Sequence, residues 1–256
     1  MERWVRPLVC VVVACAAGCS GSEDAEDERL LVLAASSLQF ALPEIAAEFE
    51  LRAGVDVDIV LGSSGNLVAQ IENGAPADLL LSADRDFVDR LEAGGWIVPG
   101  TRRDYARGRI ALVVPAGRRL PLALAELGGP QYTVVALANP ETAPYGLAAR
   151  EALEAARLWD ELAPRVVFAE NIAQAAQFVL TGNADAGVLA LSVILEHQGW
   201  EHRLVDEALH APVVQSAAVI AGSEQPVSAG AFLDFLTSPD GVRVLSRFGF
   251  GPPAAQ

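Results

Sequence analysis

Short apolar runs alternate with amphipathic segments along most of this 256-residue chain, and this alternation limits the fold more than any other feature. The apolar runs have the length of buried strands, and between them apolar residues recur at helical spacing. Strands that alternate with helices build parallel sheets covered on both faces. We therefore predict the α/β fold class. The predicted strands span 30–35, 55–61, 79–81, 110–114, 132–137, 166–168, 186–189 and 213–221.

Amphipathic helices are predicted between these strands, and several of them end at a glycine or an Asn-Gly pair, as helices commonly do. The apolar spacing places helices near 42–49, 67–71, 87–91, 120–127, 147–158, 172–180, 192–198, 227–236 and 241–248.

The strand and helix pattern restarts after Pro115, which indicates two lobes, each a mostly parallel sheet flanked by helices. The C-terminal helical segments are too short for a domain of their own, so they should return to the first lobe. Two hinge strands would carry the chain between the lobes. The predicted parts are a first lobe of 30–109 plus 220–256, a second lobe of 115–213, and hinge strands near 110–114 and 213–219.

The charge balance excludes one large class of partners. The chain has 33 acidic residues against 18 basic ones, all of them arginine, for a formal net charge of −15. An acidic surface repels polyanions, so we expect no nucleic-acid partner. All three cysteines lie within the first 19 residues, which leaves none for a disulfide framework or a Cys-rich metal site in the folded part.

The N-terminus has the pattern of an export signal. Arg3 and Arg6 precede an apolar run that is too short to span a bilayer comfortably. The run ends in Ala-Ala-Gly-Cys-Ser, which resembles a lipobox, so we predict a signal peptide over 1–19 with Cys19 as the lipid-bearing first mature residue. Cys15 fits the same pattern formally, and an ordinary secretory signal is the other alternative.

The segment 20–29 is polar and acidic and is predicted to be a disordered tether. The protein would then be exported and lie in the periplasm or on the outer face of a bacterial membrane. It would contact that membrane only through its lipid anchor.

Small polar residues stand where several predicted strands pass into helices. Ser36 and Ser37 follow the first strand, Ser63 and Ser64 follow the second, and Asn171 precedes a helix that begins near Ile172. The carboxyl ends of parallel strands share one edge of a sheet, so these helix N-termini can converge and present N–H donors to an anion. Serine and asparagine are also the preferred N-caps of any helix, so capping alone is the alternative.

Other candidate chemistry is weaker. The sequence 62–65 (GSSG) is one residue short of the G-x-S-x-G nucleophile elbow, so a secreted hydrolase that uses Ser64 lacks its motif and a marked base. The three histidines are scattered and do not have metal-ligand spacing. The acidic residues at 78–89 match helix starts better than a carboxylate site. Neither of the common glycine-rich phosphate loops is present in the sequence.

Seven segments together resemble the periplasmic molybdate-binding proteins of ABC importers. The segments are 34–38 (AASSL), 62–67 (GSSGNL), 74–84 (GAPADLLLSAD), 139–146 (NPETAPYG), 169–172 (AENI), 187–189 (GVL) and 248–250 (FGF). The segment 74–84 is the most specific of them. All seven occur in family order, so the resemblance extends from Leu30 to about Gly251.

The resemblance implies a two-lobed type II periplasmic-binding-protein fold that holds a tetrahedral oxyanion between the lobes. Ser37 and Ser64 would each provide a hydroxyl and a backbone N–H, and the N–H groups of Tyr145 and Ile172 would complete the site from the second lobe. The Tyr145 hydroxyl is a further donor. Some members place a tyrosine where this chain has Ala190, so that contact is missing here. Secondary candidates are Ser36, Ser63, Asn171 and Ala190.

The resemblance also implies the function. The chain would bind molybdate or tungstate and deliver it to the permease of an ABC transporter, as a monomer, without catalysis and without a cofactor. Molybdenum would enter only within the oxyanion, with no protein ligand to the metal. A set of donors without a titratable acceptor suits a deprotonated dianion. Sulfate, a small organic anion, and a role as a sensor subunit remain alternatives.

Overall fold

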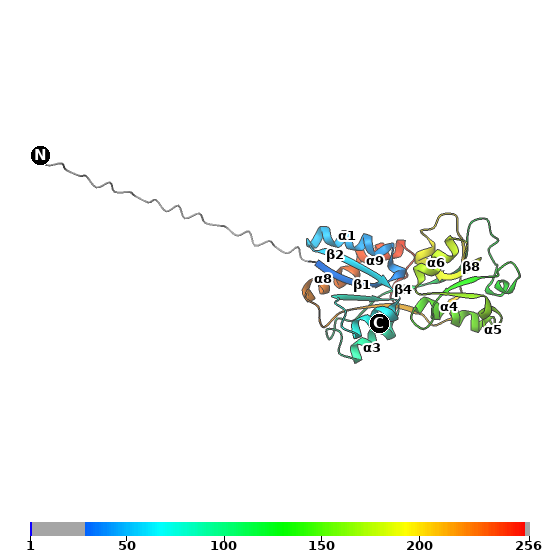
Figure 1. The fold of residues 1–256 in the computed structure, drawn as a ribbon, viewed down its shortest axis with the longest axis horizontal. Helices are drawn as coiled ribbons and strands as arrows, with labels where there is room; N and C mark the ends of the chain where they lie inside the picture. The colour runs from blue at the N-terminus through cyan, green and yellow to red at the C-terminus, as the bar shows by residue number, and fades with distance from the viewer. Residues whose placement is uncertain (2–28, 254–256) are drawn as a thin grey trace.

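The chain forms two α/β lobes in the computed structural model, which describes Met1 and residues 29–253 (Figure 1). Each lobe is built on one five-stranded sheet, so the predicted α/β class is confirmed. The signal peptide predicted over 1–19, with Cys19, lies outside the described residues beyond Met1, as does the tether except for its last residue. Arg29 begins the first strand of the first sheet instead of ending a tether.

The first sheet has the order β2-β1-β3-β10-β4. Its first three strands are parallel, and β10 is antiparallel to both of its neighbours. The strands are β1 (Arg29–Ala35), β2 (Asp56–Gly62), β3 (Leu79–Ser82), β4 (Arg103–Gly108) and β10 (Val213–Val219).

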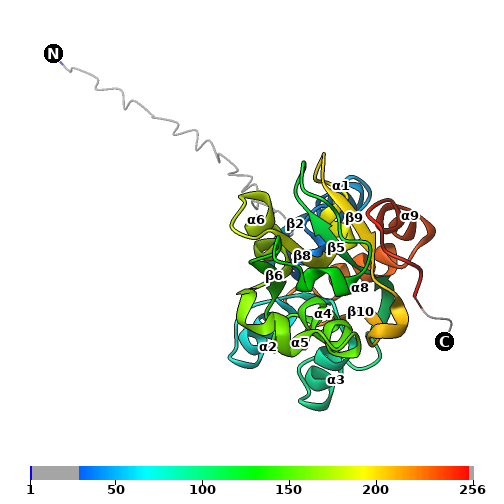
Figure 2. The same cartoon turned by 90° about the vertical axis from the view of Figure 1, so that its right-hand side faces the viewer.

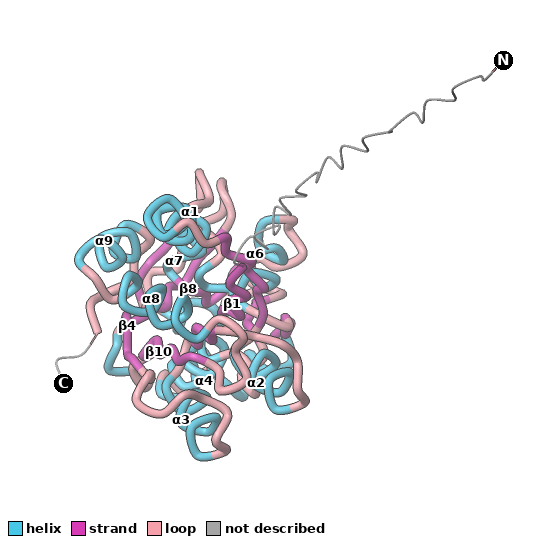
Figure 3. Tube along the Cα trace, turned by 90° about the vertical axis from the view of Figure 1, so that its left-hand side faces the viewer, coloured by secondary structure: helices cyan, strands magenta, loops and turns pink. Residues whose placement is uncertain are grey.

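Helices cover both faces of the first sheet (Figure 3). Because successive side chains of a strand point to opposite faces, Leu79 and Leu81 pack in the core beneath one set of helices, and Leu80 packs in the core beneath the other. The first set comprises α1 (Ala41–Ala53), α8 (Pro226–Leu236) and α9 (Pro239–Arg247), and the second comprises α2 (Ser64–Glu72) and α3 (Arg85–Ala93). The C-terminal helices thus return to the first lobe, as predicted.

The second sheet repeats this plan with the order β7-β6-β8-β5-β9 (Figure 2). Here too the first three strands are parallel and the fourth is antiparallel to its neighbours. The strands are β5 (Ile110–Val114), β6 (Val135–Ala138), β7 (Val166–Ala169), β8 (Ala186–Ala190) and β9 (Glu201–Leu204), and the helices are α4 (Pro144–Ala155), α5 (Trp159–Leu162), α6 (Ile172–Leu180) and α7 (Leu191–Ile194).

The chain crosses between the lobes at two places, and each lies next to a predicted hinge strand in the sequence and not within it. The segment 110–114 is β5 and belongs wholly to the second sheet, while 213–219 is β10 and belongs wholly to the first. The first passage is therefore at Gly108 to Ile110, and the second lies within 205–212. The C-terminal segment runs along the first passage, since the backbones of Gly251 and Arg107 exchange two hydrogen bonds of 2.8 and 2.9 Å.

Four local predictions were wrong. The helix predicted over 120–127 is a short 3-10 helix at Leu124–Gly128, and the helix predicted over 192–198 ends at Ile194. Two strands, β4 and β9, were missed. Both lie at sheet edges. All four β9 side chains are exposed, and β4 buries only part of its length, including Tyr105 and Ala106, so neither strand has the continuous apolar run by which buried strands are recognised.

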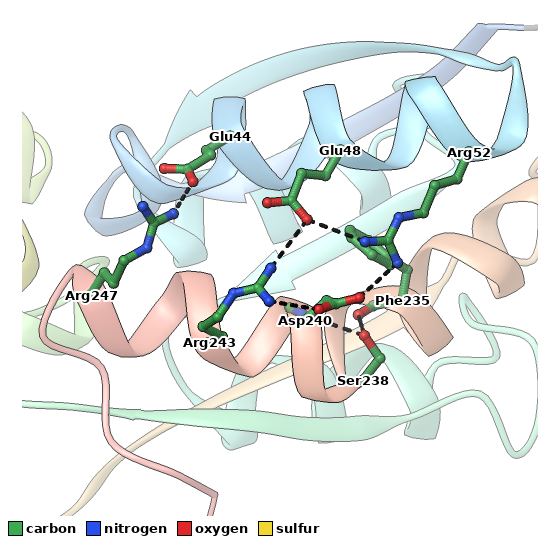
Figure 4. A network of polar contacts seen from close by, with 9 residues as sticks. Glu44, Glu48, Arg52, Phe235, Ser238, Asp240, Arg243 and Arg247 are labelled. Carbon is green, nitrogen blue, oxygen red and sulfur yellow. Dashed lines mark hydrogen bonds and ion pairs between the residues drawn. The ribbon is translucent and has the colours of Figure 1, made fainter.

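Charged side chains join α1 to α9 on the surface of the first lobe (Figure 4). Arg243 pairs with Glu48 and Asp240, and Arg52 pairs with the same two carboxylates. Arg247 bonds Glu44 one turn further along. These side chains are half exposed, so the network adds to the apolar packing beneath it without replacing it. Within the described residues, no helix is long and apolar enough to cross a bilayer.

An aspartate before the central strand ties each sheet together in the same way. Asp78 precedes β3 and accepts hydrogen bonds from Leu31 N–H, at 2.7 Å, and from the Ser223 hydroxyl, at 2.6 Å. Asp185 precedes β8 and accepts from the N–H groups of Thr133 and Val134, at 2.6 and 3.0 Å. The sequence motif Ala-Asp before a buried strand therefore has a structural role in both lobes.

The second of these aspartates leads to a prediction about acid stability. Burial raises the pKa of Asp185, but the hydrogen bonds from Thr133 and Val134 and the Arg118 guanidinium outweigh burial and lower the pKa below the ordinary value of 3.8. Its stabilising effect is therefore complete above about pH 4 and is lost as the pH falls through the lowered pKa. We expect Asp185→Asn to lower the free energy of unfolding at pH 7 by about 2 kcal/mol.

Urea unfolding from pH 7 down to about pH 2 would check this prediction, with the difference between wild type and variant closing in acid. Asp234→Asn is the matched control, because Asp234 is exposed on α8. A difference that stays constant over the whole range would contradict the assigned role of the carboxylate.

Candidate functional site

The carboxyl ends of the parallel strands of both sheets meet at a small cavity between the lobes. It has about 190 Å³ of space free of atoms, part of which is open to solvent. The strand-to-helix turns after β1, β2 and β3 form one side, and the starts of α4 and α6 form the other. The lining residues are Ala35, Ser36, Ser37, Gly62, Ser63, Ser64, Ala83, Ala143, Pro144, Tyr145 and Ile172.

Five hydroxyl groups line this cavity, and each belongs to a side chain that is at most 3% exposed. Four come from the two serine pairs predicted from the sequence, and the fifth comes from Tyr145. Since no carboxylate or basic side chain lines the cavity, its polar character rests on neutral donors and backbone groups. The structure thus brings together Ser36, Ser37, Ser63, Ser64, Tyr145 and Ile172.

Capping does not explain the serine hydroxyls. Ser63 is the N-cap residue of α2, but its side chain makes no capping hydrogen bond. The buried hydroxyls of Ser37 and Ser63 have no hydrogen-bond partner. Buried polar atoms are almost always paired, so two unpaired hydroxyls on one cavity wall indicate that a ligand completes the site.

Two other hydroxyls already accept a hydrogen bond from the protein. Ser64 Oγ accepts from Ala83 N–H at 2.9 Å, and Ser36 Oγ accepts from Ala173 N–H at 3.4 Å. A serine hydroxyl that accepts in this way still has its own proton to donate. Both side chains are therefore oriented as donors, which suits an anionic ligand.

Tyr145 stays a donor at any ordinary pH. Burial raises the pKa of its hydroxyl far above the usual value of 10, although the nearby polar side chains of Ser37, Ser192 and Gln215 oppose that rise. The Ser37 and Tyr145 hydroxyls lie close to one another but do not form a well-aligned hydrogen bond. The phenol proton therefore remains on Tyr145.

Helix N-termini point additional donors at the cavity. Ser64 is the first residue of α2, Ile172 is the first of α6, and Tyr145 follows Pro144 at the start of α4. The first N–H groups of a helix have no acceptor within the helix and carry a partial positive charge. Three helices from two lobes thus provide N–H groups to the same small volume, which is an arrangement for binding an anion.

Two of the secondary candidates lie outside the cavity wall. Asn171 caps α6, and its Oδ1 accepts from Gln174 N–H at 3.0 Å. Ala190 ends β8 and is fully buried, but it does not line the cavity. No side chain therefore reaches the site from position 190, and Tyr145 is the tyrosine that lines the cavity.

The capping role of Asn171 can be separated from ligand binding. We expect Asn171→Ala to lower the free energy of unfolding by about 1 kcal/mol, the usual cost of losing an N-cap. Ligand affinity should stay close to that of the wild type, because the Asn171 side chain does not line the cavity. Thermal unfolding and calorimetric titration of the same variant measure both quantities, and a large loss of affinity with little loss of stability would contradict the assignment.

Direct contacts between the lobes close the cavity. Gly65 N–H donates to Thr142 C=O at 2.9 Å, and the Ser192 hydroxyl donates to Ser37 C=O at 2.9 Å. At the rim, the Asn66 amide donates to Glu170 at 3.3 Å. The structure is therefore that of the closed form, in which both lobes contribute to one enclosed site.

The arrangement does not support hydrolysis. Ser64 has no histidine beside it, since none of the three histidines lines the cavity. Among residues 29–253, no group of three His, Cys, Asp or Glu side chains is placed to hold a metal ion. Asp84 caps α3 through a 2.9 Å hydrogen bond from Phe87 N–H, and burial raises the pKa of its carboxyl. Asp84 therefore has a structural role.

Sequence reasoning missed three residues that support the site, namely Ala83, Gly108 and Gln215. Ala83 holds Ser64 through its N–H, and Gly108 and Gln215 contact the Tyr145 hydroxyl. Gly108 and Gln215 do not stand at a helix start, and Ala83, in the turn between β3 and α3, has no polar side chain to mark it. The one available signal for Ala83 was its place in the 74–84 segment.

Two α/β lobes closed over a polar cavity define a bilobed binding protein of the type II periplasmic-binding-protein fold. Residues 30–251 match the family model described as bacterial extracellular solute-binding protein. The chain belongs to this family, which is one of solute-binding proteins and not of enzymes.

Individual relatives agree with this assignment. The chain is 33% identical to the molybdate-binding protein ModA of Rhodobacter capsulatus, over 86% of this chain and 87% of that protein. It is 31% identical to a putative ABC transporter substrate-binding lipoprotein of Bacillus subtilis, over 91% of this chain and 92% of the other. The solved periplasmic molybdate-binding protein of Azotobacter vinelandii superposes with a TM-score of 0.83 at 31% identity, covering 88% of this chain and 99% of that one.

Proposed function

We propose that this protein captures molybdate, and also tungstate, in the cavity between its lobes and delivers it to the permease of an ABC transporter. The observation that carries the proposal is the pair of buried, unpartnered hydroxyls, Ser37 and Ser63, on the wall of an enclosed cavity made by both lobes. An oxyanion between the lobes would accept hydrogen bonds from these hydroxyls and from the helix N-termini.

The donor set favours a dianion that carries no proton. The Ser36 and Ser64 hydroxyls already accept from the protein, and no carboxylate lines the cavity. A protonated phosphate would bring a P–OH group that lacks a ready acceptor, and a buried unpaired donor is costly. Molybdate, tungstate and sulfate have no such group.

Cavity size favours a small ligand. Even with the part that is open to solvent included, the space free of atoms is only about 190 Å³, which is below the range of roughly 300–1,000 Å³ that is typical of sites for larger organic ligands. A tetrahedral oxyanion is therefore a better match than an organic anion. Three of the relatives and solved structures at 31–33% identity are molybdate-binding proteins by name, which supports molybdate over sulfate.

Delivery and anchoring are part of the same proposal. Lobes that close only around a bound ligand let a permease distinguish the loaded from the empty protein. The Bacillus subtilis relative is named as a lipoprotein, which supports lipid attachment at Cys19 on the outer side of the membrane. The protein would act as a monomer, without a cofactor, and its partners would be the oxyanion and the permease.

A thermal-shift titration tests the ligand. The protein from Ser20 onward is heated with molybdate, tungstate, sulfate or phosphate, each over a range of concentrations. A ligand at 100 times its Kd adds about 2.7 kcal/mol of stability. We expect molybdate and tungstate to raise Tm, and phosphate to have no effect.

Each other outcome has a definite meaning. If sulfate raises Tm as much as molybdate, the protein is a general binder of deprotonated dianions. If none of the four anions changes Tm, the oxyanion proposal is wrong. If molybdate binds but the loaded protein does not stimulate the ATPase of its reconstituted transporter, delivery is wrong and a sensor role takes its place.

A further inference from the structure

Gln215 lies directly behind the cavity and contacts its wall from the first lobe. It is on β10 and fully buried. Its Nε2 lies 3.1 Å from Ala83 C=O and 3.4 Å from the Tyr145 hydroxyl oxygen. Its Oε1 is buried without a hydrogen-bond partner. Gln215 itself does not line the cavity.

The orientation of this amide follows from its neighbours. Ala83 C=O can only accept a hydrogen bond, so the NH₂ end of the Gln215 amide must face it. One N–H then donates to Ala83, and the other donates to the Tyr145 hydroxyl. The cost is a buried acceptor, Oε1, without a donor. A side chain that leaves an unpaired polar atom in the core lowers stability, which indicates a role for its two donors.

Donation by Gln215 directs the Tyr145 proton. A phenol has a single proton, and that proton cannot point at an N–H group that is donating to the same oxygen. Gly108 covers another side of the hydroxyl, because a Cβ built there would lie only 2.1 Å from the hydroxyl oxygen. The proton is left to point toward the side that holds the Ser37 and Ser192 hydroxyls and the cavity.

The same contacts join the two sides of the site. Ala83 accepts from Gln215 through its C=O and donates to Ser64 Oγ through its N–H. One continuous set of hydrogen bonds therefore runs from Tyr145 through Gln215 and Ala83 to Ser64. Tyr145 belongs to the second lobe and the other three belong to the first, so the set is complete only when the lobes are closed.

We infer that Gln215 is a positioning residue of the oxyanion site. It donates a hydrogen bond to the Tyr145 hydroxyl oxygen, so that the proton of this hydroxyl faces the ligand. The inference rests on the proposed function. Its consequence is selectivity, because a tyrosine held in this way can donate to molybdate but is poorly placed to accept from a protonated anion such as phosphate.

A double-mutant cycle tests this role. Gln215→Met keeps the length of the side chain and removes both donors, and Tyr145→Phe removes the hydroxyl. Kd values for molybdate and phosphate are measured by calorimetry for the wild type, both single variants and the double variant. Ser216→Ala is the matched control, because Ser216 is buried on the same strand and its Oγ bonds Arg103 C=O instead.

We expect Gln215→Met to weaken molybdate binding by roughly 5- to 20-fold. In the Tyr145→Phe background the same substitution should have almost no effect, and Ser216→Ala should leave affinity unchanged. The ratio of molybdate to phosphate affinity should fall in Gln215→Met. An equal loss in both backgrounds with an unchanged ratio would overturn the inference and leave the proposed function standing. If wild-type protein does not bind molybdate, the proposed function and this inference fail together.

A second measurement does not depend on the folding of Gln215→Met. The chain has three tyrosines, so ring-labelled tyrosine gives three Cζ signals, and comparison with Tyr145→Phe assigns one of them. We expect molybdate to shift the Tyr145 signal of the wild type, since its proton turns to the ligand. No shift in the saturated protein would overturn the inference.

Discussion

Replacing both Ser37 and Ser64 by alanine is expected to weaken molybdate binding by roughly a hundredfold to ten-thousandfold. Each hydroxyl would lose a hydrogen bond to a charged ligand, and such bonds contribute about 1.5–3 kcal/mol each. At about 1.4 kcal/mol for each factor of ten, the two together reach the stated range. Calorimetric titration of the double variant, or competition with tungstate if binding becomes too weak, measures the effect.

The two substitutions should differ in their effect on the ligand-free protein. Ser37 Oγ has no partner, so Ser37→Ala should leave the stability of the empty protein nearly unchanged. Ser64 Oγ accepts from Ala83 N–H, so Ser64→Ala leaves a buried N–H unpaired and should cost about 1–3 kcal/mol. Ser246→Ala, on the exposed surface of α9, is the control. If the double variant binds molybdate as tightly as the wild type, the cavity is not the binding site.

Gly108→Ala is expected to weaken molybdate binding by about 10- to 100-fold without unfolding the protein. The new methyl group would lie 2.1 Å from the Tyr145 hydroxyl oxygen and 2.6 Å from Cζ of the ring. Overpacking of this kind costs roughly 1–3 kcal/mol. Gly108 and Tyr145 belong to different lobes, so the clash opposes closure and spares each lobe. The φ angle of Gly108 is negative, so alanine brings no backbone strain.

Small-angle scattering with and without molybdate checks this mechanism, together with calorimetry. The wild type should become more compact when molybdate is added, and Gly108→Ala should do so only at much higher concentration. Gly222→Ala is the matched control, because a Cβ at Gly222 meets no atom within 4 Å. A Gly108→Ala protein with normal affinity and normal compaction would show that Tyr145 does not pack against Gly108 in the loaded form.

Residues that follow a strand directly in the sequence could be predicted as parts of the site. Ser37 and Ser64 stand at strand-to-helix turns, and parallel strands bring such turns to one edge of the sheet. Gly108 and Gln215 could not be found in this way. They lie at the end of β4 and within β10, and only the closed packing of the lobes brings them to Tyr145.

Elements of the fold could be predicted where they are buried, because burial requires apolar residues. Exposed elements carry no such requirement, and they could not be predicted. Buried strands such as β1 and β8 have continuous apolar runs, and their positions were confirmed to within a residue or two. The polar edge strand β9 gives no such signal. The 120–127 segment has apolar residues at helical spacing, but its first half forms no helix, and a 3-10 helix begins only at Leu124.

Each sheet has one strand that is antiparallel to both of its neighbours, β5 in the second sheet and β10 in the first. The positions of these strands in the chain set the order in which the lobes can be completed during export. The second sheet is continuous in the chain from Ile110 to Leu204, so it can fold as soon as that stretch has crossed the membrane. The first sheet lacks its fourth strand, β10, until residues 213–219 arrive, and α8 and α9 follow later still. Contacts this distant in sequence form slowly and leave apolar strands exposed meanwhile. The lobe that begins first is therefore the last to be finished, and it is the one that needs protection from aggregation on the way out.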